Sequence, residues 1–146
     1  MALKVEPILP RFGAELSDVD LTRPLDEETA KAIRQAQYEW GVTVWRDTGL
    51  TDETHVAFSR IFGDLFSAPK MLAQSRFALP EMFDAGNLDQ QGEIVSDERI
   101  RLHKRGDRLW HTDTSCMAHK SGWSQLRCVG ALPEGEKTWF ADARSD

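Results

Sequence analysis

Trp-His-Thr-Asp-Thr-Ser, at residues 110–115, is the stretch that says most about the fold and chemistry of this chain. Residues two apart in a β-strand point to the same face, so a strand here would bring His111 and Asp113 together. An imidazole nitrogen and a carboxylate oxygen are two of the three ligands of a 2-His-1-carboxylate site, which binds non-haem Fe(II) and leaves positions open. The same triplet also occurs as an ordinary pair of exposed polar residues, so on its own it leaves both interpretations open.

The residues that follow this stretch predict two further strands. Residues 123–132 (WSQLRCVGAL) are mostly apolar, and a Pro-Glu-Gly turn follows them. Residues 137–142 (KTWFAD) then resume a β-branched and aromatic pattern, which favours a strand. Together with a strand over 108–114, they predict three strands in the last third of the chain.

The N-terminal part carries clear signals for strands and a helix. Residues 3–22 read as short strands around Gly13, because two prolines interrupt any helix there. Asp26 is a suitable N-cap, the apolar residues after it recur with a helical period, and Gly41 is a natural stop. A helix is therefore expected between Asp26 and Gly41.

The next part of the chain predicts one more strand and one more helix before it becomes irregular. Residues 42–45 are β-branched or aromatic in a continuous run, which is typical of a short buried strand. Thr51 can cap a second helix that ends at Gly63. Residues 66–108 contain scattered prolines, glycines and charges, so we expect loops there with one strand over 83–88.

Sequence motifs in order along the chain resemble those of a known family. They are Gly-Ala-Glu-Leu with Val-Asp-Leu at 13–21, Gly-Val-Thr-Val-Trp-Arg at 41–46, Ala-Phe-Ser-Arg-Ile-Phe-Gly-Asp-Leu at 57–65, and Trp-His-Thr-Asp-Thr-Ser followed by Pro-x-Gly-x-x-Thr-x-Phe-x-Asp at 133–142. This set resembles the TauD/TfdA family of Fe(II)- and 2-oxoglutarate-dependent dioxygenases. Glu136 and Lys137 follow Gly135 where the family usually has paired glycines, so the turn before Thr138 departs from the family pattern.

The resemblance implies an α+β fold, in which this chain is the N-terminal portion of a double-stranded β-helix (a cupin-like jelly roll) with flanking helices. We expect residues 1–146 to form a single domain whose roll is incomplete in this chain. Family members are longer, and their second iron-binding His and 2-oxoglutarate-binding Arg are expected beyond Asp146. The exposed edges of such a roll predict that the chain forms a homo-oligomer or associates with the missing C-terminal half.

The resemblance also implies a reaction and a set of site residues. The parent protein is expected to be a dioxygenase that uses Fe(II), 2-oxoglutarate and O₂ to hydroxylate or oxidatively cleave a small anionic substrate, releasing succinate and CO₂. His111 and Asp113 are expected to ligate iron, and Thr138 to bind the distal carboxylate of 2-oxoglutarate. Substrate contacts are expected from Lys70, Thr114 and Ser115.

Two other functions remain open from the sequence. A zinc hydrolase would use His111 and Asp113 with His119 as the third ligand. A catalytically incomplete fragment would instead act as a binding or assembly module. Cys116 lies three residues after Asp113; we interpret it as a small, half-buried apolar residue, because a thiolate beside iron and O₂ oxidises readily.

Composition excludes several classes of function. The net charge is −6, which argues against nucleic-acid binding, and the alternating basic and apolar residues of 99–105 are interpreted as a solvated strand or loop. No apolar run has the length of a signal peptide or a membrane span. The two cysteines have no C-x-x-C spacing, which predicts reduced thiols in a cytoplasmic protein.

Overall fold

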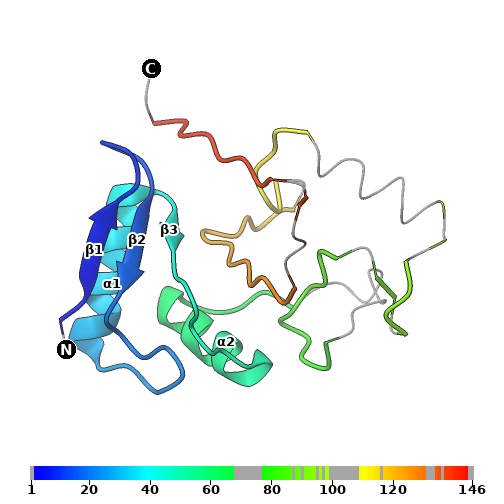
Figure 1. Cartoon of the computed structure of the whole chain (residues 1–146), viewed down its shortest axis with the longest axis horizontal. Helices are drawn as coiled ribbons and strands as arrows, with labels where there is room; N and C mark the ends of the chain where they lie inside the picture. The colour runs from blue at the N-terminus through cyan, green and yellow to red at the C-terminus, as the bar shows by residue number, and fades with distance from the viewer. Residues whose placement is uncertain are drawn as a thin grey trace. The chain divides into compact units, whose positions relative to one another are not determined.

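The computed structural model describes residues 2–67, 77–86, 88–89, 91–94, 96, 98, 109–115, 117–130, 134–135 and 137–144. The chain forms two compact units, which we name by their content. The sheet–helix unit comprises residues 1–63 and 126–146, and the loop unit comprises residues 64–125. The helices and strands that Figure 1 labels all lie in the sheet–helix unit.

A three-stranded mixed sheet begins the sheet–helix unit (Figure 1). Strand β1 (Lys4–Pro7) pairs antiparallel with β2 (Ala14–Ser17), and β2 pairs parallel with β3 (Thr43–Val44). Gly13 precedes β2 with a φ of +80°, a conformation that glycine adopts without steric penalty. The predicted strands around Gly13 and the short strand within 42–45 are therefore confirmed.

Helix α1 (Glu27–Trp40) begins and ends where the sequence predicts. The Asp26 carboxylate accepts a hydrogen bond of 2.7 Å from the Thr29 backbone N–H, which satisfies one of the free donors of the first turn. Gly41 ends the helix with a φ of +72°. One face of the helix is buried, and it carries Ala30, Ile33 and Ala36.

Helix α2 (Asp52–Ser59) also begins at its predicted cap, but it ends earlier than the sequence indicates. Thr51 and Thr54 form a capping box, in which each side chain accepts from the backbone N–H of the other residue. After Ser59 the chain tightens into the 3₁₀ helix η1 (Arg60–Phe62), and Gly63 follows. The predicted helical span is thus occupied by two kinds of helix.

The core of the sheet–helix unit lies where α1 meets the sheet and α2. One cluster of buried side chains contains Ala14, Leu16 and Ala36, and the other contains Leu21, Ile33 and Phe58. Phe58 meets Trp45 and Phe62 edge to face, at centroid distances of 6.1 and 5.9 Å. These aromatic side chains pack the core, as the sequence predicts.

The strands predicted later in the chain are absent from the described residues. Where residues 109–115, 123–130 and 137–142 are described they form turns or irregular backbone, and 83–88 contributes only the single bridge between Leu88 and Ile94. A strand needs a neighbour to satisfy its N–H and C=O groups, and no described segment lies in register with these residues. The described fold is an α+β arrangement of a small mixed sheet and two helices, and the single domain stays a prediction.

No helix within the described ranges is both long enough and apolar enough to cross a membrane.

Candidate functional site

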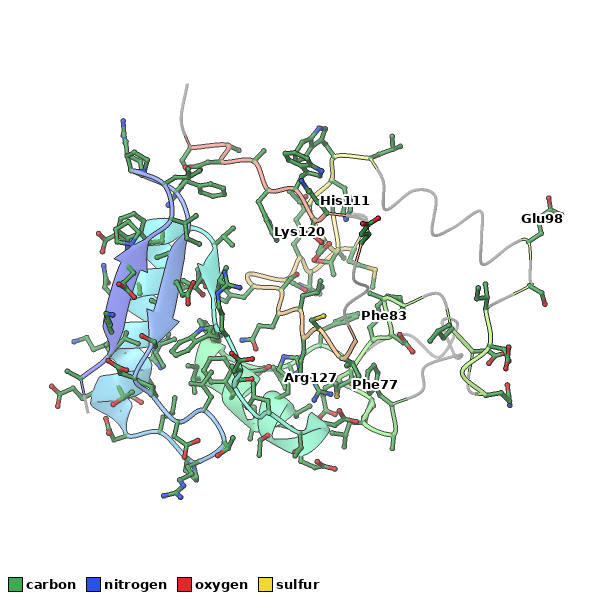
Figure 2. All side chains as sticks on the ribbon, viewed as in Figure 1. Phe77, Phe83, Glu98, His111, Lys120 and Arg127 are labelled. Carbon is green, nitrogen blue, oxygen red and sulfur yellow. The ribbon has the colours of Figure 1, made fainter. Side chains whose placement is uncertain are left out.

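His111 (labelled in Figure 2) and Asp113 meet in the loop unit, as their spacing predicts. His111 Nε2 lies 3.3 Å from Asp113 Oδ1, and about half of each side chain is exposed. The convergence does not come from a strand. The Ser115 N–H bonds the Thr112 carbonyl at 3.4 Å, so the backbone turns immediately after the pair.

The ring of His111 is oriented by the backbone beside it. His111 Nδ1 lies 2.7 Å from the Leu109 carbonyl oxygen, and a carbonyl can only accept, so Nδ1 donates the proton. In a neutral imidazole this leaves a lone pair on Nε2, which faces a carboxylate oxygen of Asp113. His111 Nε2 and Asp113 Oδ1 would then face each other with lone pairs only. At this distance they need either a cation between them or a second proton on the imidazole ring.

The spacing of these two atoms fits a shared metal ion. Two ligand atoms about 2.1 Å from a metal and at right angles to each other lie about 3.0 Å apart. The observed separation of 3.3 Å is close to that value. A hydrogen bond from the second imidazole nitrogen to a backbone carbonyl is also the usual companion of a metal-binding His. His111 and Asp113 therefore fit Fe(II) as two adjacent ligands.

Thr114 and Ser115 form the turn that follows the pair. Thr114 has a φ of +53°, and its Oγ1 accepts a hydrogen bond of 2.7 Å from the Ser121 N–H. Its carbonyl accepts a further bond of 2.9 Å from the Met117 N–H. Thr114 thus joins the His111–Asp113 turn to the loop at 117–121, while Ser115 is exposed. Their predicted contact with substrate stays a prediction.

The other predicted site residues lie elsewhere in the chain. Thr138 is exposed and belongs to the sheet–helix unit, in a described segment without helix or strand. Lys70 lies outside the described residues. The structure thus brings together His111, Asp113 and Thr114, and the roles of Thr138 and Lys70 stay predictions.

The alternative ligands considered from the sequence do not complete a site. No group of three or more metal-binding His, Cys, Asp or Glu side chains occurs within the described ranges. His119 is described and exposed, so it does not join His111 and Asp113 in a zinc centre. Cys116 lies outside the described residues.

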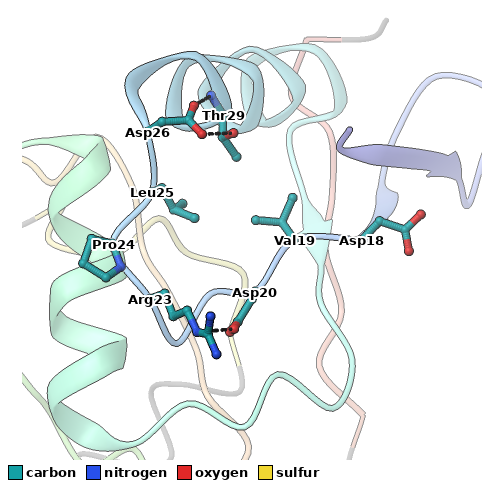
Figure 3. A pocket seen from close by; sticks show the side chains of 8 residues that line it. All are labelled: Asp18, Val19, Asp20, Arg23, Pro24, Leu25, Asp26 and Thr29. Atoms are coloured by element: carbon teal, nitrogen blue, oxygen red, sulfur yellow. Dashed lines mark hydrogen bonds and ion pairs between the residues drawn. The ribbon is translucent and has the colours of Figure 1, made fainter. Parts of the chain in front are cut away.

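An open pocket of about 280 Å³ lies in the sheet–helix unit, before the start of α1 (Figure 3). Two of its carboxylates, those of Asp20 and Asp26, have structural partners. A hydrogen bond from the Thr22 hydroxyl is the main cause that lowers the pKa of Asp20, and the Thr29 backbone N–H does the same for Asp26. Arg23 pairs with Asp20 at 3.1 Å. These contacts form a turn and a helix cap. The carboxylates that line the pocket would also repel an anionic substrate.

Two arginines make long-range contacts that the sequence gave no reason to expect. Arg127 donates to the Leu50 carbonyl at 2.6 Å and pairs with Asp52, at the beginning of α2 (Figure 2). Arg144 donates to carbonyls of the last turn of α1. One indirect feature of the sequence pointed to such a contact. The last turn of α1 has no basic residue of its own, so the negative end of the helix dipole is open to a cation from elsewhere in the chain.

A match over almost the whole chain decides the family. The family model described as "Taurine catabolism dioxygenase TauD, TfdA family" matches residues 4–145. The chain belongs to the TauD/TfdA family. The matched range includes His111, Asp113 and Thr138, so the TauD/TfdA assignment covers segments of both units.

Known members of the TauD/TfdA family are similar over about half their length. An alpha-ketoglutarate-dependent 2,4-dichlorophenoxyacetate dioxygenase of Cupriavidus pinatubonensis is 30% identical, over 99% of this chain and 52% of that protein. An alpha-ketoglutarate-dependent sulfate ester dioxygenase of Pseudomonas putida is 27% identical, over 97% of this chain and 42% of that protein. The chain thus spans about half the length of the curated relatives it matches.

A solved structure extends this likeness to the fold. The crystal structure of AAD-2 in complex with Mn(II) and N-oxalylglycine is 28% identical, with a TM-score of 0.65 over 79% of this chain and 38% of that chain. The likeness in fold therefore extends over most of this chain.

Proposed function

We propose that the natural protein is an Fe(II)- and 2-oxoglutarate-dependent dioxygenase that hydroxylates or oxidatively cleaves a small anionic organic substrate. Decarboxylation of 2-oxoglutarate to succinate and CO₂ accompanies the reaction. The observation that carries this proposal is the convergence of His111 Nε2 and Asp113 Oδ1 at 3.3 Å in a chain of the TauD/TfdA family.

The roles of the residues follow from their chemistry. His111 and Asp113 hold Fe(II), and the Leu109 carbonyl keeps the imidazole in the tautomer that presents Nε2. The bound iron supplies the oxidative chemistry with O₂, and the protein orients the reactants. Thr138 donates its hydroxyl to the distal carboxylate of 2-oxoglutarate. Thr114 keeps the turn closed through its bond with Ser121.

The preference for an anion rests on the relatives and on charge. The two relatives act, by name, on 2,4-dichlorophenoxyacetate and on a sulfate ester, and both compounds carry a negative charge. The chain itself has a net charge of −6, so its overall field repels anions and a local cation must hold the substrate. Lys70 is our candidate for that cation, with Thr114 and Ser115 as polar contacts.

We further propose that the two units belong to one domain that completes a jelly roll with other residues. Exposed apolar side chains of the sheet–helix unit support this. Four of them, between 58% and 76% exposed, are Leu126, Val129, Trp139 and Phe140. Apolar surface of this kind favours association with the remainder of a longer chain or with a second copy. We place the protein in the cytoplasm.

The test is an assay of the natural protein at the full length of its relatives. Succinate formation is measured with Fe(II) and 2-oxoglutarate in the presence of aryloxyalkanoates, alkyl sulfates and sulfonates. Each acid is paired with its neutral methyl ester or amide as a matched control. Stimulation of succinate formation by an acid and not by its neutral analogue is the expected result. Equal stimulation by both would refute the anionic substrate, and no succinate with any compound would refute the reaction class.

The alternative is a binding or assembly module without catalysis. It is favoured by the fact that only two candidate iron ligands come together among the described residues. A module would bind its partner equally well after His111→Ala and would consume no 2-oxoglutarate. The succinate assay therefore separates the two functions.

A further inference from the structure

The C-terminus of α1 is completed by a residue from the other end of the chain. The last four carbonyls of an α-helix have no partner within the helix. In α1, backbone N–H groups satisfy the first and last of them: Gly41 donates to Gln37, and Gly13 and Val42 donate to Trp40. The two carbonyls between them, of Tyr38 and Glu39, accept hydrogen bonds of 3.0 and 3.2 Å from Arg144 Nη1.

Arg144 is held in that position by Asp142. Its Nε and Nη2 donate to the two oxygens of the Asp142 carboxylate at 2.8 and 3.0 Å, and its backbone N–H donates to the same carboxylate at 3.0 Å. The Asp142 carboxylate also raises the pKa of Arg144. A planar guanidinium can make this two-oxygen contact and still direct its third nitrogen to carbonyls, which an ammonium group cannot do.

The surface of α1 leaves just enough room for this contact. A Cβ atom added to Gly41 would lie 3.0 Å from Arg144 Nη2 and 3.1 Å from Phe12 Cε2. Gly41 is also in the left-handed region, with a φ of +72°. The absence of a side chain at Gly41 thus serves both the helix end and the approach of Arg144.

The segment before Asp142 has little else to hold it. Residues 137–141 form no helix or strand, and within the described part of the chain they make no hydrogen bond or ion pair. Thr138 lies in this segment, four residues before Asp142. At the other end, Arg127 joins the chain to α2. The backbone that carries Thr138 is therefore attached at Arg127 on one side and at Asp142 and Arg144 on the other.

We propose that Arg144 is a positioning residue for 2-oxoglutarate. By binding Asp142 and the end of α1, it fixes the segment 137–144 and so places the Thr138 hydroxyl where it can meet the distal carboxylate of 2-oxoglutarate. This inference rests on the proposed function. Arg144 does not itself touch the cosubstrate; it acts only through the position of Thr138.

The test uses the natural full-length protein carrying Arg144→Gln. The affinity for 2-oxoglutarate is measured by anaerobic calorimetry of the Fe(II)-loaded protein, and hydrogen exchange is measured at the amides of residues 137–144. We expect binding to weaken about tenfold, the loss of one well-placed hydrogen bond to a charged group. Exchange in the segment should accelerate. In turnover, KM for 2-oxoglutarate should rise more than kcat falls.

Matched variants separate positioning from general destabilisation. Arg46→Gln removes another long-range surface ion pair, 2.9 Å from Glu15, and should change neither readout. Arg144→Lys should restore part of the affinity, because an ammonium can still reach the carbonyls of α1. If Arg144→Gln does not fold, Asp142→Asn removes only the paired charge and should show the same change in weaker form.

The outcomes that contradict the inference are distinct. A wild-type protein that does not bind 2-oxoglutarate would overturn the proposed function and this inference with it. If the wild type binds and Arg144→Gln binds equally well, the role of Arg144 alone is wrong. Equal loss of affinity in Arg46→Gln would also overturn it, because the effect would then be a general loss of stability.

Discussion

At the scale of single residues, the candidate metal site depends on a turn. His111 and Asp113 belong to a segment of irregular backbone, and the chain reverses at Thr114 with a φ of +53°. A threonine in this conformation is sterically disfavoured, so contacts must hold it there. Its hydroxyl accepts from the Ser121 N–H and its carbonyl accepts from the Met117 N–H, and His111 Nδ1 donates to the Leu109 carbonyl beside it. These bonds support the turn that brings His111 and Asp113 together.

Removal of either ligand should abolish the activity of the natural protein. His111→Ala or Asp113→Ala takes away one of the two proposed iron ligands, so Fe(II)-dependent succinate formation should fall by more than about 100-fold, beyond the loss typical of outer contacts. His119→Ala is the matched control, because this exposed His does not join the pair. Near-full activity in His111→Ala would refute the assignment.

Thr114 should affect the same reaction less strongly. Thr114→Ala removes the oxygen that accepts from Ser121, and we expect turnover to fall by about 10–100-fold, as for residues that orient metal ligands. Thr114→Ser keeps the hydroxyl and should retain most activity. Steady-state turnover at saturating Fe(II) measures both variants. A serine variant as impaired as the alanine variant would show that the hydroxyl is not what matters.

At the scale of elements, α1 organises the sheet–helix unit, and its N-cap makes it sensitive to pH. The Thr29 backbone N–H is the main cause that lowers the pKa of Asp26 in the folded protein. A group with a lowered folded pKa stabilises the fold above its unfolded pKa of about 3.9, and this contribution disappears as the pH falls through the folded value.

Asp26→Asn should therefore remove a pH dependence. Asparagine can still cap the helix but does not titrate in this range. The difference in melting temperature between wild type and Asp26→Asn should be largest near about pH 6 and shrink below about pH 4. Thermal unfolding of both proteins across this range checks it. A constant difference between the two proteins would show that the carboxylate charge is irrelevant.

Ile33 should be among the most sensitive positions of α1. Its side chain is fully buried, and it packs with Leu21 and Phe58. Ile33→Ala should lower the free energy of unfolding by about 2–5 kcal/mol, since it removes buried methyl groups and leaves a cavity. Ile94→Ala, at a side chain that is 71% exposed, is the matched control and should have little effect. Urea unfolding measures both changes.

The sequence predicted those elements whose signals are local. Asp26 and Gly41 bound α1, and Thr51 begins α2, because a cap acts within one turn of its own helix. The strands over 123–132 and 137–142 do not form in the described residues, because a strand needs a distant partner that its own sequence does not supply, and the jelly roll to which they would belong stays a prediction. The two-residue spacing of His111 and Asp113 correctly predicted that their side chains meet. The predicted strand does not form there, and a turn brings the two side chains together instead. Arg144 was missed because its partners on α1 are more than a hundred residues away.

At the scale of the whole molecule, the N-terminal part of the described chain has a buried apolar core, whereas large apolar side chains later in the chain are exposed. The buried hydrophobic residues of the described chain all lie before residue 60: Ala14, Leu16, Leu21, Ala30, Ile33, Ala36 and Phe58. Large apolar side chains later in the chain, such as Leu109, Trp110 and Trp139, are more than 70% exposed. The sheet and helices have a core of their own, whereas the segments that carry the candidate site residues have little buried apolar surface to fix them.

Residues 1–146 expressed alone should therefore bind 2-oxoglutarate weakly and should not turn over. In the proposed site, His111 and Asp113 would supply two metal ligands, and Thr138 would offer the cosubstrate a single neutral hydrogen bond, which is about half as strong as a contact from a charged group. We expect a dissociation constant above about 1 mM by anaerobic calorimetry with Fe(II), corresponding to less than about 4 kcal/mol of binding free energy. The natural protein at the full length of its relatives should bind in the micromolar range and consume oxygen when substrate is added.

His111→Ala in the longer protein is the control, because it removes a proposed ligand without changing the length of the chain. Micromolar binding with substrate-stimulated oxygen uptake by residues 1–146 would contradict this prediction, and the remaining ligands would then have to come from this chain or from a second copy of it.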